Sequence, residues 1–440
     1  MNKALKDLGK KRILILGFGR EGQSTLNFLR KYFPKKNVAI ADQNEFVTKD
    51  KHVQLYIGKN YLDDILKYDV IFKSPGITYR LPQIAKANKL GKMYSQTRLF
   101  FDLCKGTIIG VTGTKGKSTT TTLIYEILKT SGRKAVLLGN IGKPCLDYLD
   151  KDLGGGTTFC FELSSHQLFD LKKSPHIAVF LNIFREHLDY YKSLNEYFGA
   201  KANITNYQTR HDFFIYNSSF KKVSNLAKVT LAKKFAFSVT KKLLADLGKI
   251  IPPAEIPLKG EHNLNNVMAA VQVAKSLNID KRIIRKAIKK FRPLEHRLQK
   301  VGSYCGIEFY DDTLATIPEA TIAAIESFGG RVGTVILGGS DRGQNFRGLA
   351  KAVLRAKIEN VVLFPDTGKR IWSDIKNVGS KIVPRHIYVN SMKEAVQACY
   401  EFTSKGKICL LSSASPSFGI FKNYEEKSAL FKKFMILYGK

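Results

Sequence analysis

The 440-residue sequence contains no long hydrophobic run that could cross a membrane. Near the start, RILILG is a short apolar segment between charged residues, and it lacks the length of a secretory signal. We therefore expect neither membrane insertion nor export. A cytoplasmic location is the prediction that follows.

Cysteine is sparse, and its spacing carries no metal or disulfide pattern. The six cysteines are scattered along the chain, and no two of them form a CxxC pair. This spacing argues against a zinc ribbon and against a disulfide framework, and it is typical of the reducing cytosol. The sequence also shows no repeat of fixed short period, which argues against a solenoid.

Acidic residues are few, with 37 against 72 lysines and arginines, so the formal net charge is +35. Such a charge attracts polyanions, which include nucleic acid, anionic membranes and phosphorylated substrates. The lysines are spread along the whole chain, however, and form no low-complexity tail. We therefore favour a general lysine bias with a highly anionic substrate, and we expect no specific nucleic-acid partner.

The composition is that of a globular protein, with 44% hydrophobic and 25% charged residues. At about 150 residues per domain, the length suggests roughly three domains. Short β-branched runs alternate with helical periods, which predicts an α/β protein with parallel sheets. We expect domains over residues 1–103, 104–297 and 298–440, the first and third Rossmann-like and the central one like a P-loop ATPase. The predicted strands are RILILG, VAIAD and VIFKS, then TIIGVTG, KAVLLG, TTFCFEL and IAVFLNI, and finally EFYDD, VGTVILGG, NVVLFPD, HIYV and ICLLSS.

A glycine-rich turn follows the first predicted strand. Gly17, Gly19 and Gly22 form a GxGxxG pattern ahead of a predicted helix over residues 21–32. Such glycines let the backbone approach a pyrophosphate at the helix N-terminus, and Asp42 could accept a hydrogen bond from a ribose or a base. On its own the pattern fits a dinucleotide-dependent dehydrogenase or a mere tight turn.

A second glycine-rich turn, GVTGTKGKST, lies between a predicted strand and a helix over residues 117–130. Its backbone N–H groups and Lys117 can hold the phosphates of a nucleotide, and the hydroxyl of Ser118 or Thr119 can reach Mg²⁺. The spacing is a variant of the P-loop, because five residues separate Gly110 from Gly116. Two nucleotide-type turns in one chain argue against a simple dehydrogenase.

Four further residues lie near the ends of predicted strands or on a helix. Glu162 ends TTFCFEL, where a carboxylate can bind magnesium or, alternatively, cap a helix. His187 and Asp189 follow another buried strand, so we expect them at the same edge of the sheet. Lys201 has no charge motif around it, and composition alone predicts a solvated surface lysine.

Taken together and in this order, the motifs resemble those of the Mur ligases, the ATP-dependent amide-forming enzymes of peptidoglycan precursor synthesis. Within that family they are most similar to the glutamate-adding branch. The matching segments are GFGREG, SPGI, GVTGTKGKST, GNIGKP, FELSSHQL, NIFREHLDYY, GEHNLNNVMAA, HRLQ, YDDTLATIPEA, LGGSDRGQNF and SSASPSFGIFKNYEEK. They extend over nearly the whole chain.

The resemblance implies a ligase reaction with three substrates, namely UDP-N-acetylmuramoyl-L-alanine, ATP and glutamate, with D-glutamate favoured. It also implies Mg²⁺, two ions in all, and a monomeric enzyme. The carboxylate of the UDP substrate attacks ATP to form an acyl phosphate, and the amine of glutamate then displaces phosphate. Two polyanions must approach each other, so cations and helix N-termini have to offset their repulsion.

The same resemblance implies roles for individual residues. For the UDP substrate these are Gly17, Gly19, Gly22, Asp42, Ser74, Pro75, Gly76, Asn140 and His187. For ATP they are Gly113, Thr114, Lys115, Gly116, Lys117, Ser118, Thr119, Asn266, Arg297 and Asp312. The metal-binding set is Ser118, Glu162, His187 and a carbamylated Lys201, and the catalytic set is Lys117, His187 and Lys201. For the amino acid they are Thr316, Arg342, Ser413, Ser415 and Phe421. The last three belong to the resembling C-terminal loop, which comprises Ser413, Ser415 and Phe418 to Asn423.

Three positions depart from the family pattern. Lys115 replaces a common asparagine of the P-loop, and a cation there can face phosphate. Leu314 and Arg342 stand where the D-glutamate ligases usually carry lysines. Arginine could grip a carboxylate through two hydrogen bonds, whereas leucine could not. An L-glutamate-adding relative is therefore the main alternative.

Three more distant kinds of protein fit parts of this pattern. A folylpolyglutamate-synthase-like ligase shares the P-loop but not the SPGI segment. A P-loop protein that binds nucleic acid or a membrane surface predicts salt-sensitive DNA binding without phosphate release. An NAD-linked oxidoreductase predicts changes in cofactor absorbance.

Overall fold

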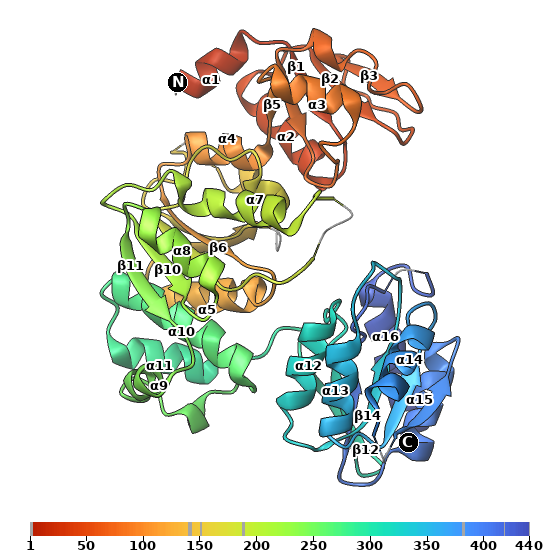
Figure 1. The fold of residues 1–440 in the computed structure, drawn as a ribbon. Helices are drawn as coiled ribbons and strands as arrows, with labels where there is room; N and C mark the ends of the chain where they lie inside the picture. The colour runs from red at the N-terminus through yellow and green to blue at the C-terminus, as the bar shows by residue number, and fades with distance from the viewer. Residues whose placement is uncertain are drawn as a thin grey trace. The chain divides into compact units, whose positions relative to one another are not determined.

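The structure is a computed structural model that describes residues 3–139, 143–149, 152–186, 190–380, 383–417 and 419–439. The described chain forms three sheets, each with helices packed against it (Figure 1). It divides into two compact units. The first contains Met1–Ile250 and Asn265–Ile288, and the second contains Ile251–Leu264 and Lys289–Lys440.

The first sheet is parallel, with strand order β3-β2-β1-β4-β5. Its elements are α1 (Lys3–Gly9), β1 (Ile13–Leu16), α2 (Arg20–Tyr32), β2 (Val38–Asp42), β3 (Val53–Ile57), η1 (Ile65–Lys67), β4 (Val70–Lys73), α3 (Pro82–Lys89), β5 (Met93–Tyr94) and α4 (Gln96–Leu103). Side chains alternate across β1: Ile13 and Ile15 share a core with α2 and α4, whereas Leu14 and Leu16 share one with α3. Every residue of β1 is buried, as expected for a strand covered on both faces.

The second sheet is also parallel, in the order β11-β10-β9-β6-β8-β7. Its elements are β6 (Thr107–Thr112), α5 (Lys117–Thr130), β7 (Ala135–Gly139), η2 (Cys145–Tyr148), β8 (Thr158–Glu162), α6 (Ser165–Leu168), β9 (Ile177–Phe180), α7 (Leu194–Asn206), β10 (Phe213–Asn217), α8 (Lys221–Val229), β11 (Lys233–Phe237) and α9 (Lys241–Gly248). β6 pairs with both β8 and β9, so the carboxyl ends of these three strands share one edge. The chain then continues through η3 (Pro253–Glu255), α10 (Glu261–Ser276) and α11 (Lys281–Lys290).

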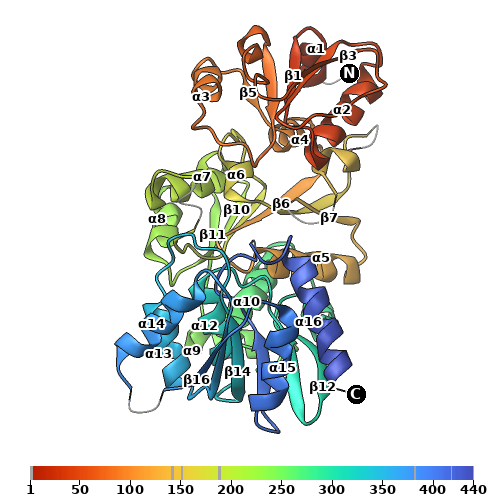
Figure 2. The same ribbon diagram turned by 90° about the vertical axis from the view of Figure 1, so that its right-hand side faces the viewer.

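The third sheet has the order β12-β13-β17-β14-β15-β16. Its elements are β12 (Gln299–Tyr304), β13 (Ile307–Asp311), α12 (Pro318–Glu326), β14 (Val332–Leu337), α13 (Arg347–Arg355), β15 (Asn360–Leu363), α14 (Gly368–Val378), β16 (Arg385–Tyr388), α15 (Met392–Phe402), β17 (Ile408–Leu411) and α16 (Tyr424–Tyr438). One core joins α12, α13 and α14 to one face of the sheet, and another joins α15 and α16 to the other face (Figure 2). Helices on both faces make this a Rossmann-like layer arrangement.

One strand departs from the predicted parallel pattern. β12 runs antiparallel to β13, because a two-residue turn joins them. Both turn residues have positive φ, 50° at Cys305 and 80° at Gly306, which is the backbone of a type I′ hairpin. The predicted fold class is otherwise confirmed.

Sheet membership is compatible with the expected domains, since α4 ends at Leu103 and β12 begins at Gln299. The boundaries near 103 and 297 stay a prediction. Among the helices in the described part of the chain, none is long and apolar enough to cross a membrane.

Candidate active site

The second glycine-rich turn connects β6 to α5 and depends on glycine at its last position. Gly113 and Gly116 adopt φ of 154° and 85°, which other residues rarely adopt. A Cβ at Gly116 would lie 2.3 Å from Oδ1 of Asn266. The turn therefore packs directly on α10, and α5 begins at the next residue, Lys117, so the N-terminus of α5 adjoins the loop.

We expect Gly116→Ala to damage this turn. The added methyl group meets the Asn266 side chain and the backbone stays at a positive φ, so both the loop and α10 must shift. Nucleotide affinity should fall by roughly tenfold or more, while the thermal unfolding midpoint drops by a few degrees. Gly132→Ala is a matched control, because Gly132 also has a positive φ but has open space around it. Equal nucleotide binding by the two variants would contradict the packing argument.

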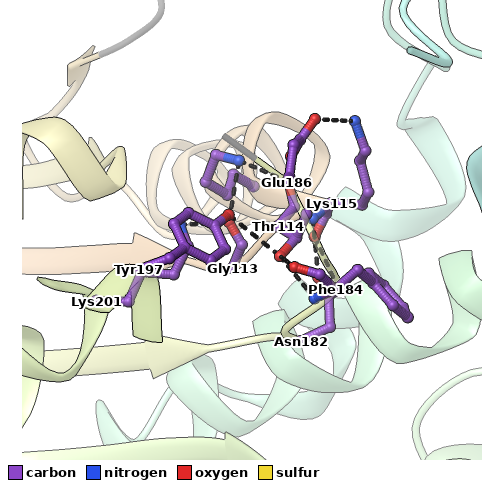
Figure 3. A network of polar contacts seen from close by, with 9 residues as sticks. Gly113, Thr114, Lys115, Asn182, Phe184, Glu186, Tyr197 and Lys201 are labelled. Atoms are coloured by element: carbon purple, nitrogen blue, oxygen red, sulfur yellow. Dashed lines mark hydrogen bonds and ion pairs between the residues drawn. The ribbon is translucent and has the colours of Figure 1, made fainter. Parts of the chain in front are cut away.

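Asn182, which follows β9, holds the loop through hydrogen bonds. Its amide Nδ2 donates to the Lys115 carbonyl at 2.9 Å, and its Oδ1 accepts the Lys115 N–H at 2.8 Å. Its own carbonyl accepts the Thr114 N–H at 3.0 Å. Figure 3 shows this reciprocal pairing beside Phe184, whose N–H donates to the Thr114 hydroxyl at 2.9 Å. The loop shape is thus fixed by a neighbouring strand, a role that the sequence did not reveal.

Three lysines surround the loop. Lys117 Nζ donates to the carbonyls of Gly113 at 3.0 Å and Thr114 at 2.8 Å. Lys201 Nζ donates to the same Gly113 carbonyl at 2.9 Å, and Lys115 pairs with Glu186 at 3.0 Å (Figure 3). Lys115 and Lys117 bring two cations to a helix N-terminus, which suits a polyphosphate.

Lys201 is buried, which corrects the surface position that composition alone predicted. The residue is 1% exposed, and its Nζ lies over the Tyr197 ring at 4.9 Å from the centroid. The helix α7 directs it at the loop rather than at solvent. Burial lowers the pKa of Lys201 well below its usual value, and the nearby Lys117 lowers it further.

Glu162 ends β8 and is 2% exposed. It does not cap the following helix, because Ser164 caps α6 through a capping box with Gln167. Its partner in register on β6 is Val111, at the strand end that leads to the loop. The Glu162 carboxylate and the buried Ser118 hydroxyl are hard oxygen donors, so they fit Mg²⁺, which takes few protein ligands beside phosphates. Within the described ranges no three His, Cys, Asp or Glu residues gather into a metal site.

Four residues named by the sequence analysis lie outside the described residues. They are Asn140, His187, Asp189 and Phe418. Their predicted roles stay predictions.

The first glycine-rich turn lines a cavity of about 390 Å³. The structure brings together Gly17, Gly19, Asp42, Ser74 and Gly76 of the predicted set in its wall. Gly22 lies behind the wall, where an added Cβ would come within 2.2 Å of the Gly17 carbonyl. Pro75 lies within the Ser74–Gly76 segment but does not line the cavity.

Asp42 shapes this turn as well as lining it. One carboxylate oxygen accepts the Phe18 N–H at 2.7 Å and the other accepts the Asn44 N–H at 2.8 Å. Sequence reasoning missed several wall residues that follow the ends of β2 and β4 or lie beyond β3. They are Gln43, Asn44, Tyr61, Ile77, Thr78 and Leu81. Their place just after strands of a parallel sheet was the signal that could have found most of them.

The second unit has its own cavity, of about 460 Å³, and Arg297 lines it together with Asn263, Tyr310 and Phe328. Asp312 is buried at the end of β13, where it accepts hydrogen bonds from Ser412 Oγ at 2.8 Å and the Leu298 N–H at 3.2 Å. Burial raises the pKa of Asp312 to about 7. Asn266 belongs to the first unit, and its Oδ1 accepts the Thr120 hydroxyl at 3.2 Å.

The predicted amino-acid residues lie beyond the carboxyl ends of β13, β14 and β17. Ser413 and Ser415 are buried, and Ser415 Oγ lies 2.9 Å from Thr367 Oγ1. Arg342 is exposed and Thr316 is half-buried. Phe421 packs edge-on against Phe364 with ring centroids 5.4 Å apart.

Two residues in this loop region were missed. Lys427 is buried, donates to Ser413 Oγ at 2.6 Å and lies over the rings of Phe364 and Phe421. The Ser417 hydroxyl is buried and has no hydrogen-bond partner among the described residues. Composition does not indicate that a particular lysine is buried, so Lys427 could not have been found in this way. Ser417 could have been found, because it lies between Ser415 and Phe418 of the predicted amino-acid loop.

Three family models match the chain in sequence order. They are the Mur ligase MurD-like N-terminal domain over residues 11–94, the Mur ligase middle domain over residues 111–274, and the Mur ligase glutamate ligase domain over residues 296–415. Together they account for all three sheets.

Curated relatives match at full length. The UDP-N-acetylmuramoylalanine--D-glutamate ligase of Acetivibrio thermocellus is 33% identical over 465 residues, covering 98% of each chain. The protein of the same name from Geobacillus kaustophilus is 34% identical over 443 residues, covering 96% of each.

Solved structures share the fold. MurF from Acinetobacter baumannii aligns with a TM-score of 0.62 at 15% identity, over 96% of this chain and 90% of that one. The UDP-N-acetylmuramate-alanine ligase MurC of Thermotoga maritima aligns with a TM-score of 0.59 at 20% identity, over 97% and 99%. With relatives more than 30% identical across their whole length, the resemblance inferred from the motifs is confirmed, and the chain belongs to the Mur ligase family.

Proposed function

We propose that the chain is an ATP-dependent ligase that joins D-glutamate to UDP-N-acetylmuramoyl-L-alanine in peptidoglycan precursor synthesis. The observation that carries the proposal is the full-length similarity to D-glutamate ligases, which leaves no part of either chain unmatched beyond a few per cent. The glycine-rich turns, the buried lysine and the third sheet all fall within the aligned region.

The turn at 113–116 holds the phosphates of ATP. The N-terminus of α5 presents N–H groups, and Lys117 turns from the loop carbonyls to the phosphate oxygens. Ser118 and Glu162 would hold Mg²⁺, and the bound ion would neutralise part of the charge on the phosphates. We assign ATP contacts to Asn266, Arg297 and Asp312. We add Asn263 to this set because it lines the same cavity as Arg297.

Lys201 serves this site in its carbamylated form. The neutral amine attacks the carbon of carbon dioxide, so that an N–C bond forms as one C=O π bond opens, and the nitrogen releases a proton to solvent. The product carries a carboxylate in place of the amine. Such a group has the oxygen chemistry that a divalent ion prefers. Its place beside Gly113 puts it against the phosphate loop. His187 completes the proposed metal and substrate set.

The first cavity takes the UDP part of the acid substrate, and the loops beyond β14 and β17 take glutamate. In the reaction, a carboxylate oxygen of the substrate attacks the γ-phosphorus and ADP leaves, giving an acyl phosphate. The glutamate nitrogen then attacks the acyl carbon, phosphate leaves, and the nitrogen loses a proton as the amide forms. The protein contributes positioning and charge neutralisation at each step.

Phosphate release tests the proposal. ATP, Mg²⁺ and UDP-N-acetylmuramoyl-L-alanine are incubated with D- or L-glutamate, and we expect sustained release with the D enantiomer only. Leu314 and Arg342 make the comparison informative, because the usual lysines are absent. Faster turnover with L-glutamate would favour the L-glutamate-adding alternative, and no release with either would refute the ligase assignment. Two Mg²⁺ ions, a monomeric state and a cytoplasmic location stay predictions.

A further inference from the structure

The loop at residues 338–346 joins β14 to α13 and carries Arg342, which is proposed for the amino-acid site. The Arg342 N–H donates to Oε1 of Gln344 at 2.8 Å, and the Gly343 N–H donates to Oδ1 of Asp341 at 2.8 Å. These two bonds fix the backbone on both sides of the Arg342 side chain. That side chain is exposed, and among the described residues no carboxylate pairs with its guanidinium.

Arg370, in the first turn of α14, holds this loop from outside. Its Nη1 forms an ion pair with the Asp341 carboxylate, and its Nη2 donates to the Gln344 carbonyl at 2.8 Å. The guanidinium also lies 5.4 Å from the centre of the Phe346 ring. A single side chain of a neighbouring helix therefore contacts the loop before and after Arg342.

The same ion pair decides which cation Asp341 faces. The bonds from Arg370 and from the Gly343 N–H lower the pKa of Asp341 below its usual value, so this residue is a carboxylate at neutral pH. Without Arg370, its charge would attract the adjacent Arg342 guanidinium and repel the carboxylates of glutamate. Both members of the pair are partly exposed, and such a pair adds little to the stability of the fold.

Backbone hydrogen bonds join this loop to the serines that are proposed for the amino acid. The Gly338 N–H donates to the Ser413 carbonyl at 2.8 Å. Two residues further along, the Ser340 N–H donates to the Pro416 carbonyl at 2.9 Å. The loop at 338–346 and the serine segment therefore lie side by side, so a shift of one loop changes the position of the other.

Thr367, the residue before α14, links the two loops on their buried side. Its hydroxyl donates to the Gly339 carbonyl at 3.0 Å and accepts the Gly339 N–H at 3.1 Å. The same hydroxyl oxygen lies 2.9 Å from Ser415 Oγ. The beginning of α14 thus contacts the amino-acid site twice, through the buried Thr367 and through the exposed Arg370.

We propose that Arg370 is a positioning residue for the amino-acid site, which pairs with Asp341 so that Arg342 faces a carboxylate of the incoming amino acid. Arg370 acts through the loop at 338–346 and does not contact the amino acid itself. The inference rests on the proposed function and extends it, because it names the group that keeps a cation directed at an anionic substrate.

Arg370→Met removes the charge and keeps an unbranched side chain beside Phe346. We expect KM for glutamate to rise about three- to tenfold, while KM for ATP and KM for the UDP substrate stay within about twofold of wild type. A coupled assay for ADP measures all three values, with the glutamate enantiomer that wild type turns over. The thermal unfolding midpoint should stay within about two degrees, because the pair is partly exposed.

Arg355→Met is the matched control for the loss of an exposed arginine. Arg355 lies in the last turn of α13 and forms an ion pair with Glu326 of α12, in the same unit as Arg370. Neither residue belongs to the loop at 338–346. We expect this variant to keep the wild-type KM for glutamate.

A second substitution tests whether the charge of Asp341 causes the loss. Asp341→Asn combined with Arg370→Met removes the carboxylate that has lost its partner, so KM for glutamate should recover at least half of its increase on a logarithmic scale. Arg370→Lys keeps a cation beside Asp341 and should also recover part of it.

The outcomes distinguish this inference from the proposed function. If wild type releases no ADP with either enantiomer of glutamate, the proposed function fails and the inference fails with it. If wild type is active but Arg370→Met keeps the wild-type KM for glutamate, the inference alone is overturned. It is also overturned if all three KM values rise together, or if Asp341→Asn brings no recovery.

Discussion

Phosphate release from ATP should fall by about 10²- to 10³-fold when Lys117 is replaced with alanine. In the structure the Lys117 ammonium already lies within 3.0 Å of two loop carbonyls, at the N-terminus of α5. Removal leaves the β- and γ-phosphates with backbone N–H groups and Mg²⁺ but without the Lys117 cation. A coupled assay for ADP, run with saturating UDP substrate and D-glutamate, measures the loss.

Lys129→Ala is the control for charge on the same helix. Lys129 lies in the last turn of α5 and is exposed, so its removal lowers the net charge equally without touching the loop. Activity should stay within about twofold of wild type. If Lys117→Ala kept full activity while remaining folded, the turn at 113–116 would not be the ATP site.

Interior strands were predicted from the sequence with the exception of β10, whereas of the edge strands only β7 and β16 were predicted. VAIAD is strand β2 over the predicted residues, and the helix predicted over residues 117–130 is α5. β11, by contrast, has two exposed lysines at the start of KKFAF and lies at the edge of the second sheet, so it shows no continuous apolar run. The hairpin of β12 depends on a turn containing Cys305 at positive φ, which its residue type does not indicate.

The residues of the candidate site also fall into two groups, those that local sequence patterns predict and those that depend on distant contacts. Glycines and P-loop residues follow from local patterns, because the backbone conformation they permit is a local property. Like Lys73, Lys201 and Lys427 differ from the exposed lysines in being buried by distant segments. The role of Lys201 could therefore be predicted only from the family resemblance, and Lys427 was missed. The reciprocal bonds between Asn182 and Lys115 link residues 67 positions apart, which no local pattern encodes.

Replacing Lys201 with alanine should reduce turnover by about 10²- to 10⁴-fold, and short carboxylic acids should restore part of it. The side chain is buried against Gly113 and Tyr197, so its removal leaves a space beside the phosphate loop. If the native group is a carbamate, acetate or formate can occupy that space and supply the lost oxygens. Ligase activity is measured against acetate concentration, at constant ionic strength with chloride as the balancing anion.

Two further measurements make the Lys201 prediction decisive. Protein kept in ¹³C-bicarbonate should show one carbamate carbon resonance that is absent from Lys201→Ala, a readout independent of turnover. Lys228→Ala, at an exposed lysine in the last turn of α8, should keep both the resonance and full activity. Thermal unfolding of Lys201→Ala separates lost chemistry from lost folding, because only a folded variant can be rescued by added acid. A folded variant with wild-type turnover would show that the buried amine serves the packing around Tyr197 and takes no part in the reaction.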